Sequence, residues 1–164
     1  MMIYEEVFRR FQKERIDYMI VGGIATNLLG ALRATADLDI VIDTTRENMT
    51  RVDTVMKALG YRLKQPIDIK KLDERALKGL MKTKHLKAIS YHNINEPMKE
   101  VDIVVDSPVS FERAKKRMVK MTVGGLNLPV ISIDDLIRMK VKAARSVDKY
   151  DVAELRKIKK MRAR

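Results

Sequence analysis

The stretch Tyr18-Met-Ile-Val-Gly-Gly23, followed after thirteen residues by Asp37-Leu-Asp-Ile-Val-Ile-Asp43, decides the fold. Its first part is a short apolar run that stops at two glycines, which is typical of a buried strand ending in a tight turn. Its second part alternates acidic and apolar residues and then becomes continuously apolar, which predicts a strand with an exposed start and a buried body. The intervening residues 24–32 have the composition of a helix. The centre of the fold is therefore predicted to be strand, helix, strand.

The segments before and after this centre predict further helices. Apolar residues at four-residue intervals predict a helix over 3–14, and Thr44-Thr-Arg-Glu47 matches a capping box that opens a second helix, ended by Gly60. Ser132-Ile-Asp-Asp135 matches another capping box, and we expect its helix to turn Leu136, Ile137, Val141 and Ala144 inward. A last helix should bury Val152, Leu155 and Ile158.

Two pairs of strands complete the pattern. Residues 85–91 and 100–105 are predicted to form one hairpin, and residues 117–123 and 126–131 a second one around Gly124-Gly125. Residues 61–84 show no firm period beyond a weak helical stretch over 73–80. This mixture predicts an α/β (α+β) fold, with a mixed β-sheet flanked by helices and C-terminal helices.

Composition limits the class of protein. A chain of 164 residues with 46% hydrophobic residues suits a single domain over residues 1–164. No apolar run is long enough for a membrane span and the N-terminus is charged, so we expect a cytoplasmic protein that does not bind membranes. The absence of cysteine excludes disulfides and thiolate metal sites, which leaves oxygen ligands for any metal. The net charge of +12 favours phosphate-rich partners, although a well-solvated surface would have the same composition.

Three carboxylates stand out at the predicted strands. Asp37 and Asp39 are two positions apart, so their side chains share one face of a strand, and Asp102 in Val101-Asp102-Ile103 joins them if its strand lies alongside. Like charges about 4 Å apart repel by roughly 4 kcal/mol at an effective dielectric near 20. A divalent cation reverses this repulsion, and two Mg²⁺ ions can stabilise the attacking and leaving oxygens of a nucleotidyl transfer.

The glycine pair suggests where a nucleotide binds. Gly22 and Gly23 follow a strand and precede a helix, so a triphosphate could approach their backbone closely. Either feature alone has an ordinary explanation, since most glycine pairs are simple turns and an Asp-x-Asp at a strand end is often only solvated. Their combination is far more specific.

Val21-Gly22-Gly23, Asp37-Leu38-Asp39-Ile40 and Val101-Asp102-Ile103, in this order, resemble the nucleotidyltransferase superfamily typified by DNA polymerase beta. The stretch Arg33-Ala-Thr35-Ala-Asp37 and the segment from Asp134 to Asp151 look most like small nucleotidyltransferases related to the AbiEii toxins. The resemblance implies a nucleotidyltransferase fold, Mg²⁺ held by Asp37 and Asp39, and Asp102 as a third carboxylate that activates an acceptor hydroxyl. It also implies that Lys140 meets the nucleotide phosphates. The chain departs from it at Gly23, where many members carry Ser, and it is shorter than the AbiEii toxins.

Other candidate residues have two explanations each. Arg33 suits either a phosphate or an ion pair with Asp37, and Thr35 either orients the metal site or only favours a strand. Lys140 is a phosphate ligand or a solvated helix residue, and Asp148 is better explained as a helix start. We count Gly22, Gly23, Arg33, Thr35 and Lys140 as candidate nucleotide-binding residues.

The leading hypothesis is a Mg²⁺-dependent enzyme that transfers a nucleoside monophosphate from an NTP to a hydroxyl of tRNA, another RNA, a protein or a small molecule. One form of it is the toxin of a toxin–antitoxin pair, with an acidic antitoxin as partner. The alternative is a noncatalytic module with the same fold that binds nucleic acid or a partner protein. The alternative predicts binding that depends on salt but not on Mg²⁺.

Overall fold

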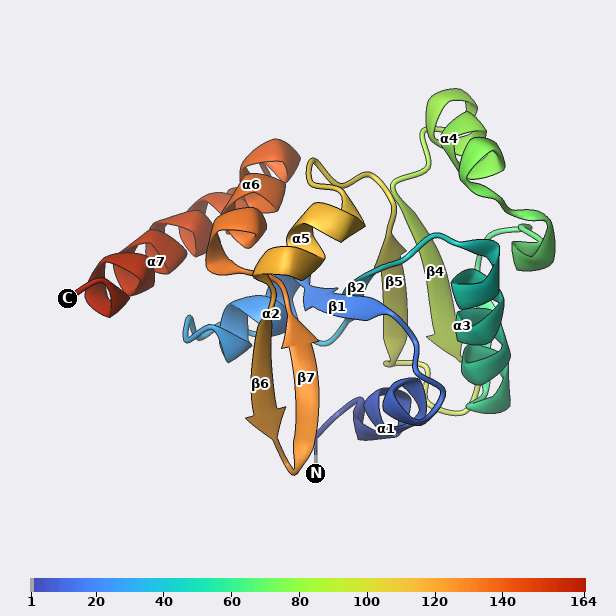
Figure 1. Ribbon diagram of the computed structural model, residues 1–164, viewed down its shortest axis with the longest axis horizontal. Coiled ribbons are helices and arrows are strands. Elements are labelled where there is room, and N and C mark those ends of the chain that lie inside the picture. Colours follow the sequence, from blue (N-terminus) through green and yellow to red (C-terminus); the bar gives the residue numbers. More distant parts are fainter. Residues whose placement is uncertain (1) are drawn as a thin grey trace.

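A seven-stranded mixed sheet organises the computed structural model, which describes residues 2–164. The strand order is β3-β4-β5-β2-β1-β7-β6, and Figure 1 shows the β6–β7 hairpin and α4 on opposite sides of the molecule. The strands are β1 (Tyr18–Val21), β2 (Leu38–Ile42), β3 (Tyr61–Leu63), β4 (Ala88–Asn93), β5 (Glu100–Val104), β6 (Val119–Val123) and β7 (Leu126–Val130). The predicted class, a mixed sheet flanked by helices, is confirmed.

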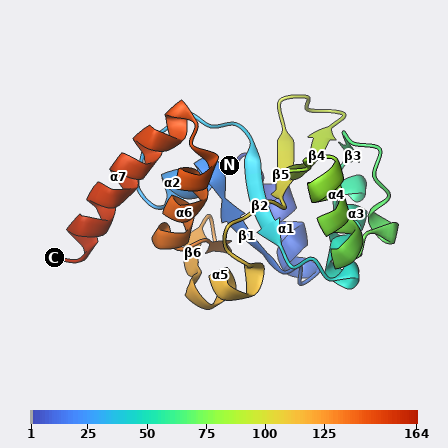
Figure 2. The same ribbon diagram turned by 90° about the horizontal axis from the view of Figure 1, so that it is seen from above.

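Seven α-helices and one 3₁₀ turn accompany the sheet. They are α1 (Glu5–Lys13), α2 (Gly22–Leu28), α3 (Arg46–Ala58), η1 (Ile69–Lys71), α4 (Glu74–Thr83), α5 (Phe111–Arg117), α6 (Ile133–Ala143) and α7 (Ser146–Arg162), all within residues 2–164. Seen from above in Figure 2, α6 and α7 lie on one side of the molecule and α3 and α4 on the other. In the described part of the chain, no helix is both long and apolar enough to cross a membrane.

The strand pairing sets the position of the functional side chains. β1 runs antiparallel to β2, whereas β2 and β5 are parallel neighbours. Both predicted hairpins exist, since β4 pairs with β5 and β6 pairs with β7, each antiparallel. The central β2 is therefore held on both sides by backbone hydrogen bonds.

Strands β4 and β5 each turn one face toward the core. Ile89 and Tyr91 on β4 are buried, as are Val101 and Ile103 on β5, while the alternate residues are only half-buried. Successive side chains of a strand point to opposite faces. Asp102, which lies between Val101 and Ile103, is therefore on the more open face.

The predicted buried face of α6 is right at Leu136, which is 1% exposed, and at Ile137, which packs against the core, but it is wrong at the C-terminal end of the helix. Val141 is 55% exposed and Ala144 is also exposed, whereas Lys140 is buried with 4% exposure. The periodicity of apolar residues misled here because the buried neighbours of α6 include carboxylates of α7, which bind the lysine ammonium.

Other boundaries differ from the predictions. Helix α2 ends at Leu28 rather than 32, because the chain turns at Gly30, where φ is +114°. The cap of α3 is Thr45, which accepts from the Asn48 amide, so the predicted capping box was one residue early. Ile3 is exposed instead of joining the α1 stripe. Helix α5 was missed because it has seven residues and only Ala114 is buried.

Candidate active site

Asp39 and Asp102 lie side by side on neighbouring strands. The parallel β2–β5 ladder pairs Asp39 with Asp102 in register, so both side chains project from the same face of the sheet. The condition set by the sequence, that the strand of Asp102 lies beside that of Asp39, is therefore met. One oxygen of Asp102, Oδ1, is buried and has no hydrogen-bond partner among the described residues.

The electrostatics of this pair are unfavourable without a cation. Burial, together with the neighbouring charges of Asp102 and Asp37, raises the pKa of Asp39 to about 6, against the opposing effects of the Gly23 amide and Arg145. A carboxylate whose ionised form is this strongly disfavoured gains from a positive ligand. Hard oxygen donors and an unpartnered buried oxygen are the features that suit Mg²⁺.

Asp37 is less closely engaged than predicted. It precedes β2 and is exposed, although burial and the charges of Glu100 and Asp102 raise its pKa. Within residues 2–164, no three acidic, histidine or cysteine side chains are grouped closely enough to hold a metal ion as they stand. The structure thus brings two of the three predicted carboxylates together, with Asp37 nearby at the exposed start of the strand.

The two glycines make room for side chains rather than for open solvent. At Gly22, where φ is +65°, an added Cβ would lie 2.0 Å from Oδ2 of Asp39. At Gly23 an added Cβ would lie 2.5 Å from Oγ1 of Thr35. Glycine at 22 therefore lets the Asp39 carboxylate pack against the turn, and Thr35 covers Gly23, which is buried. The departure from Ser at 23 has a steric explanation in Thr35.

A cleft of about 490 Å³ contains the pair. Its lining includes Gly22, Asp39 and Asp102 on one side and α6 residues with Arg145 on the other. Of the predicted nucleotide-binding residues, Gly22 and Lys140 line this cleft, whereas Gly23, Arg33 and Thr35 do not. The size is within the usual range for a small-molecule site.

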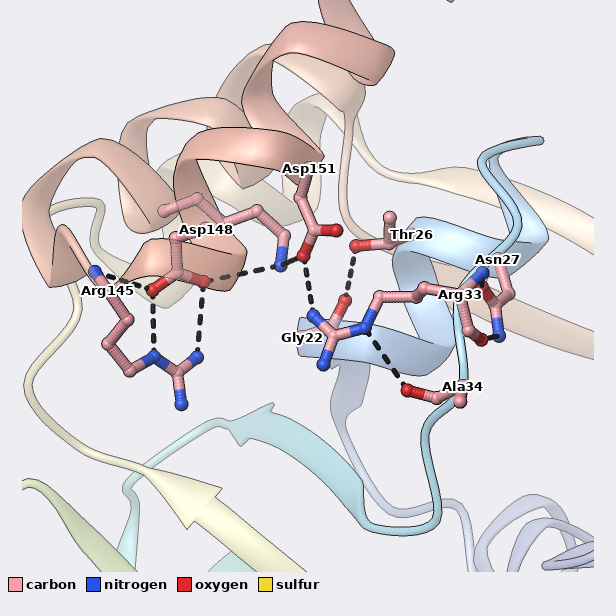
Figure 3. Close-up of polar contacts among 9 residues, drawn as sticks. Gly22, Thr26, Asn27, Arg33, Ala34, Arg145, Asp148 and Asp151 are labelled. Atoms are coloured by element: carbon pink, nitrogen blue, oxygen red, sulfur yellow. Dashed lines mark hydrogen bonds and ion pairs between the residues drawn. The ribbon is translucent and has the colours of Figure 1, made fainter.

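Lys140 and Arg33 share one buried carboxylate, as Figure 3 shows for Arg33 and Asp151. The Lys140 ammonium lies 2.7 Å from Asp151 and 3.6 Å from Asp148, and the Arg33 guanidinium lies 2.5 Å from Asp151. Arg33 thus forms an ion pair, but with Asp151 and not with Asp37. Lys140 lines the cleft with its charge already engaged, so a phosphate would compete with two carboxylates for it.

Arg145 begins α7 and faces the cleft. Its Nε and Nη2 donate to the Asp148 carboxylate at 2.8 and 3.2 Å, and its backbone amide donates to the same group at 3.1 Å (Figure 3). Although burial raises the pKa of Asp148, the hydrogen bond and charge of Arg145 outweigh it and lower that pKa overall. The interpretation of Asp148 as a helix start agrees with this geometry.

Several residues of the cleft were not predicted from the sequence. Arg145 received no role, and neither did Lys87, Asp106 or Lys142, of which Lys142 and Asp106 form an ion pair of 2.7 Å. Only the placement of Arg145 three residues before Asp148 had a local signal, a reciprocal cap. The others come from separate elements, and nothing in their local sequence indicates a shared site.

Comparison with known proteins decides the family. The model of the aminoglycoside-2''-adenylyltransferase family matches residues 4–155. The chain belongs to this family. Members of this family are nucleotidyltransferases, which transfer a nucleoside monophosphate to a hydroxyl acceptor. The prediction that this protein is an enzyme of the nucleotidyltransferase class is therefore confirmed.

Solved structures agree with this family member in fold. The lincomycin-bound lincosamide antibiotic adenylyltransferase LnuA has a TM-score of 0.62 at 14% identity, with 95% of this chain and 96% of that chain covered. ANT(2'')-Ia in complex with adenylyl-2''-tobramycin has a TM-score of 0.58 at 12% identity, with 98% and 93% covered. A putative nucleotidyltransferase from Thermotoga maritima has a TM-score of 0.57 at 14% identity, with 99% and 92% covered.

The finer resemblance is not supported in the same way. A search of curated proteins found no match to this chain. The relation to the nucleotidyltransferase superfamily is confirmed, whereas the nearer relation to AbiEii toxins is not.

Proposed function

We propose that the protein transfers a nucleoside monophosphate from an NTP to a hydroxyl acceptor in a Mg²⁺-dependent reaction that releases pyrophosphate. The observation that carries the proposal is the pairing of Asp39 with Asp102 in a cleft, with one buried oxygen of Asp102 left without a partner. Asp39 and Asp102 would hold one or two Mg²⁺ ions, with Asp37 as an outer ligand. When bound, the metal neutralises charge on the phosphates and on the leaving group.

The chain's own groups supply positioning and proton transfer. Asp102 would accept the proton of the acceptor hydroxyl, since it lies within the cleft beside Asp39. Arg145 carries a guanidinium into the same cleft while Asp148 fixes its Nε and Nη2, so its remaining nitrogen would meet a phosphate oxygen. Gly22 keeps the Asp39 carboxylate close to the turn.

Arg33, Thr35 and Lys140 act indirectly in this proposal. Lys140 and Arg33 neutralise Asp151 and thereby tie α6 and the residues before β2 to α7. Thr35 covers Gly23, whose amide lowers the pKa of Asp39. Substitution of Arg33, Thr35 or Lys140 should therefore weaken nucleotide binding by changing the shape of the site and not by removing a direct contact.

The proposal is tested by calorimetry of ATP, GTP, CTP and UTP with and without Mg²⁺, for the native chain and for the variant with Asp37→Asn and Asp39→Asn. We expect Mg²⁺-dependent binding of at least one NTP, and loss of this dependence in the variant. Retained Mg²⁺-dependent binding in the variant would assign the metal to other residues. Salt-dependent binding of a nucleic acid without any NTP binding would instead favour the noncatalytic module.

A toxin role with an acidic antitoxin is a second candidate, favoured by the net charge of +12. It requires that a small acidic protein encoded beside this one blocks nucleotidyl transfer. A neighbouring acidic protein that leaves transfer unchanged would exclude it as the antitoxin.

A further inference from the structure

Half of the chain's net charge is concentrated in one segment beside the cleft. Residues 62–87, which we call the basic segment, contain nine Lys or Arg and three Asp or Glu, a net charge of +6 out of +12. All nine cationic side chains are exposed. Such a concentration exceeds what solubility needs, because solubility is served by cations spread over the whole surface.

Several of these cations are free to bind an anion. Arg75, Lys82, Lys84 and Lys87 have no carboxylate within 4.0 Å among the residues that the structure describes. Arg75 and Lys82 are seven positions apart on α4, which places them on one side of the helix about 10 Å apart. The basic segment thus presents a row of cations, which suits a ligand with repeated negative charges.

The row leads into the candidate active site. Helix α4 ends at Thr83, and the chain continues through Lys84 to Lys87, which lines the cleft together with Asp39 and Asp102. The other three cations of the lining, Lys140, Lys142 and Arg145, are all ion-paired with carboxylates. Lys87 is the cation of the lining that is left for a second substrate.

The same charges disfavour a polycationic acceptor such as an aminoglycoside. A ligand with several ammonium groups would be repelled by the basic segment, and bound Mg²⁺ would neutralise Asp39 and Asp102. The other two carboxylates of the cleft, Asp106 and Asp148, are already ion-paired. The basic segment contains no Phe, Tyr or Trp, so it lacks a platform for stacking bases. Recognition through phosphates, with little sequence preference, is what remains.

We propose that the acceptor is the 3' end of a single-stranded nucleic acid, whose backbone follows the basic segment so that its terminal hydroxyl reaches Asp102. This inference rests on the proposed nucleotidyl transfer. The hydroxyl oxygen forms a bond to the α-phosphorus of the NTP, and the bond from that phosphorus to the oxygen bridging to the β-phosphate breaks. The hydroxyl proton passes to the Asp102 carboxylate, and pyrophosphate leaves.

The test uses the full chain with Mg²⁺ and labelled NTPs. The acceptors are a 20-nucleotide oligoribonucleotide, an oligodeoxyribonucleotide of the same sequence, the same oligoribonucleotide with a 3' phosphate, and the aminoglycoside kanamycin. We expect one labelled nucleotide or more to be added to an oligonucleotide with a free 3' hydroxyl, and none to the blocked one; the RNA and DNA arms identify the source of the strand. Transfer to kanamycin alone would overturn this inference and leave the proposed function intact, whereas absence of Mg²⁺-dependent NTP binding would remove both.

A pair of matched variants tests the surface itself. The first carries Arg75→Gln, Lys82→Gln and Lys84→Gln; the control carries Lys120→Gln, Lys160→Gln and Arg164→Gln, which remove the same charge from β6 and from the C-terminal part of the chain, away from α4 (Figure 1). Oligonucleotide binding is measured against salt concentration, and folding by circular dichroism.

We expect the slope of log K against log salt to fall by about 2 in the first variant, because each lost contact to a single strand contributes about 0.7. We expect oligonucleotide binding at fixed salt to weaken tenfold or more in the first variant, with NTP binding unchanged. In the control, both oligonucleotide binding and the slope should stay close to those of the native chain. Equal slopes in the two variants would overturn the assignment of the basic segment.

Discussion

Two groups of charged residues, each built around buried or half-buried carboxylates, are associated with the cleft, and they are built in opposite ways. Asp39 and Asp102 are like charges on adjacent strands, and within residues 2–164 no Lys or Arg forms an ion pair with either. Across the cleft, Arg33, Lys140 and Arg145 alternate with Asp151 and Asp148 in a connected set of ion pairs. In its ion pairs the first group is incomplete and the second is complete, although Oδ1 of Asp151, like Oδ1 of Asp102, has no hydrogen-bond partner among the described residues. The comparison indicates that the Asp39–Asp102 group binds a positive ligand, whereas the ion-paired group stabilises the fold.

The largest expected effect comes from opening the complete group. Asp151→Ala would leave the Lys140 ammonium buried without its nearest partner, so the free energy of unfolding should fall by about 3–5 kcal/mol in urea denaturation. Asp134→Ala is the matched control, because its partner Lys159 lies on α7 and both side chains are about half exposed. The control should lose no more than about 1 kcal/mol. Equal losses in the free energy of unfolding would show that the buried Lys140–Asp151 pair contributes no more stability than the exposed Lys159–Asp134 pair.

A smaller effect of opposite sign is expected at the incomplete group. Asp39→Asn, in EDTA at pH 7, should raise the free energy of unfolding by about 1–3 kcal/mol, because a pKa raised to about 6 means that the ionised group opposes folding. The folded pKa lies above the unfolded one, so the native chain should lose stability as the pH rises from about 4 through about 6. The variant should not show this loss. Urea denaturation across this range checks it, and a flat profile for the native chain would contradict the comparison.

The smallest effect concerns the turn that holds Asp39. Gly22→Ala combines a positive φ with a Cβ that overlaps the Asp39 carboxylate, so we expect a loss of about 1–2 kcal/mol and weaker Mg²⁺-dependent NTP binding. Gly79→Ala is the control, because it lies in α4 with no atom within 4 Å of the added Cβ. It should stabilise the chain by about 0.5–1 kcal/mol. NTP binding that survives Gly22→Ala at native strength would mean that Asp39 does not need its contact with the turn.

The sequence predicted the strands around the site because local patterns encode them. The segment from Asp37 to Asp43 alternates acidic and apolar residues and then becomes continuously apolar. This pattern was enough to predict strand β2 and to place Asp39 on the same face as Asp37. The pairing with Asp102 depended on strand order, which no local pattern contains. It was stated as a condition and the β2–β5 register fulfils it.

Both C-terminal helices were predicted in position, and the burial of Val152 and Leu155 on α7 is confirmed, but the buried face of α6 was predicted wrongly at its C-terminal end. Lys140 looks like a surface residue between apolar neighbours, and only the return of α7 with Asp148 and Asp151 makes its burial favourable. Periodicity assigns faces by apolar content and therefore fails where a helix buries a charge against a charge. Arg145 and Lys87 were missed for a related reason, because their site is assembled from separate elements.

The register of β2 with both of its neighbours has a consequence for the energetics of ligand binding. Val21 pairs with Asp39 across β1, and Asp39 pairs with Asp102 across β5, so the backbone ladder fixes both carboxylates before any ligand arrives. A ligand that binds there orders no loop to bring them together, and the conformational entropy of that step has already been lost on folding. The sheet thus preorganises the two carboxylates for binding. A slip of the β2 register by one residue would turn Asp39 to the opposite face and remove its carboxylate from the site.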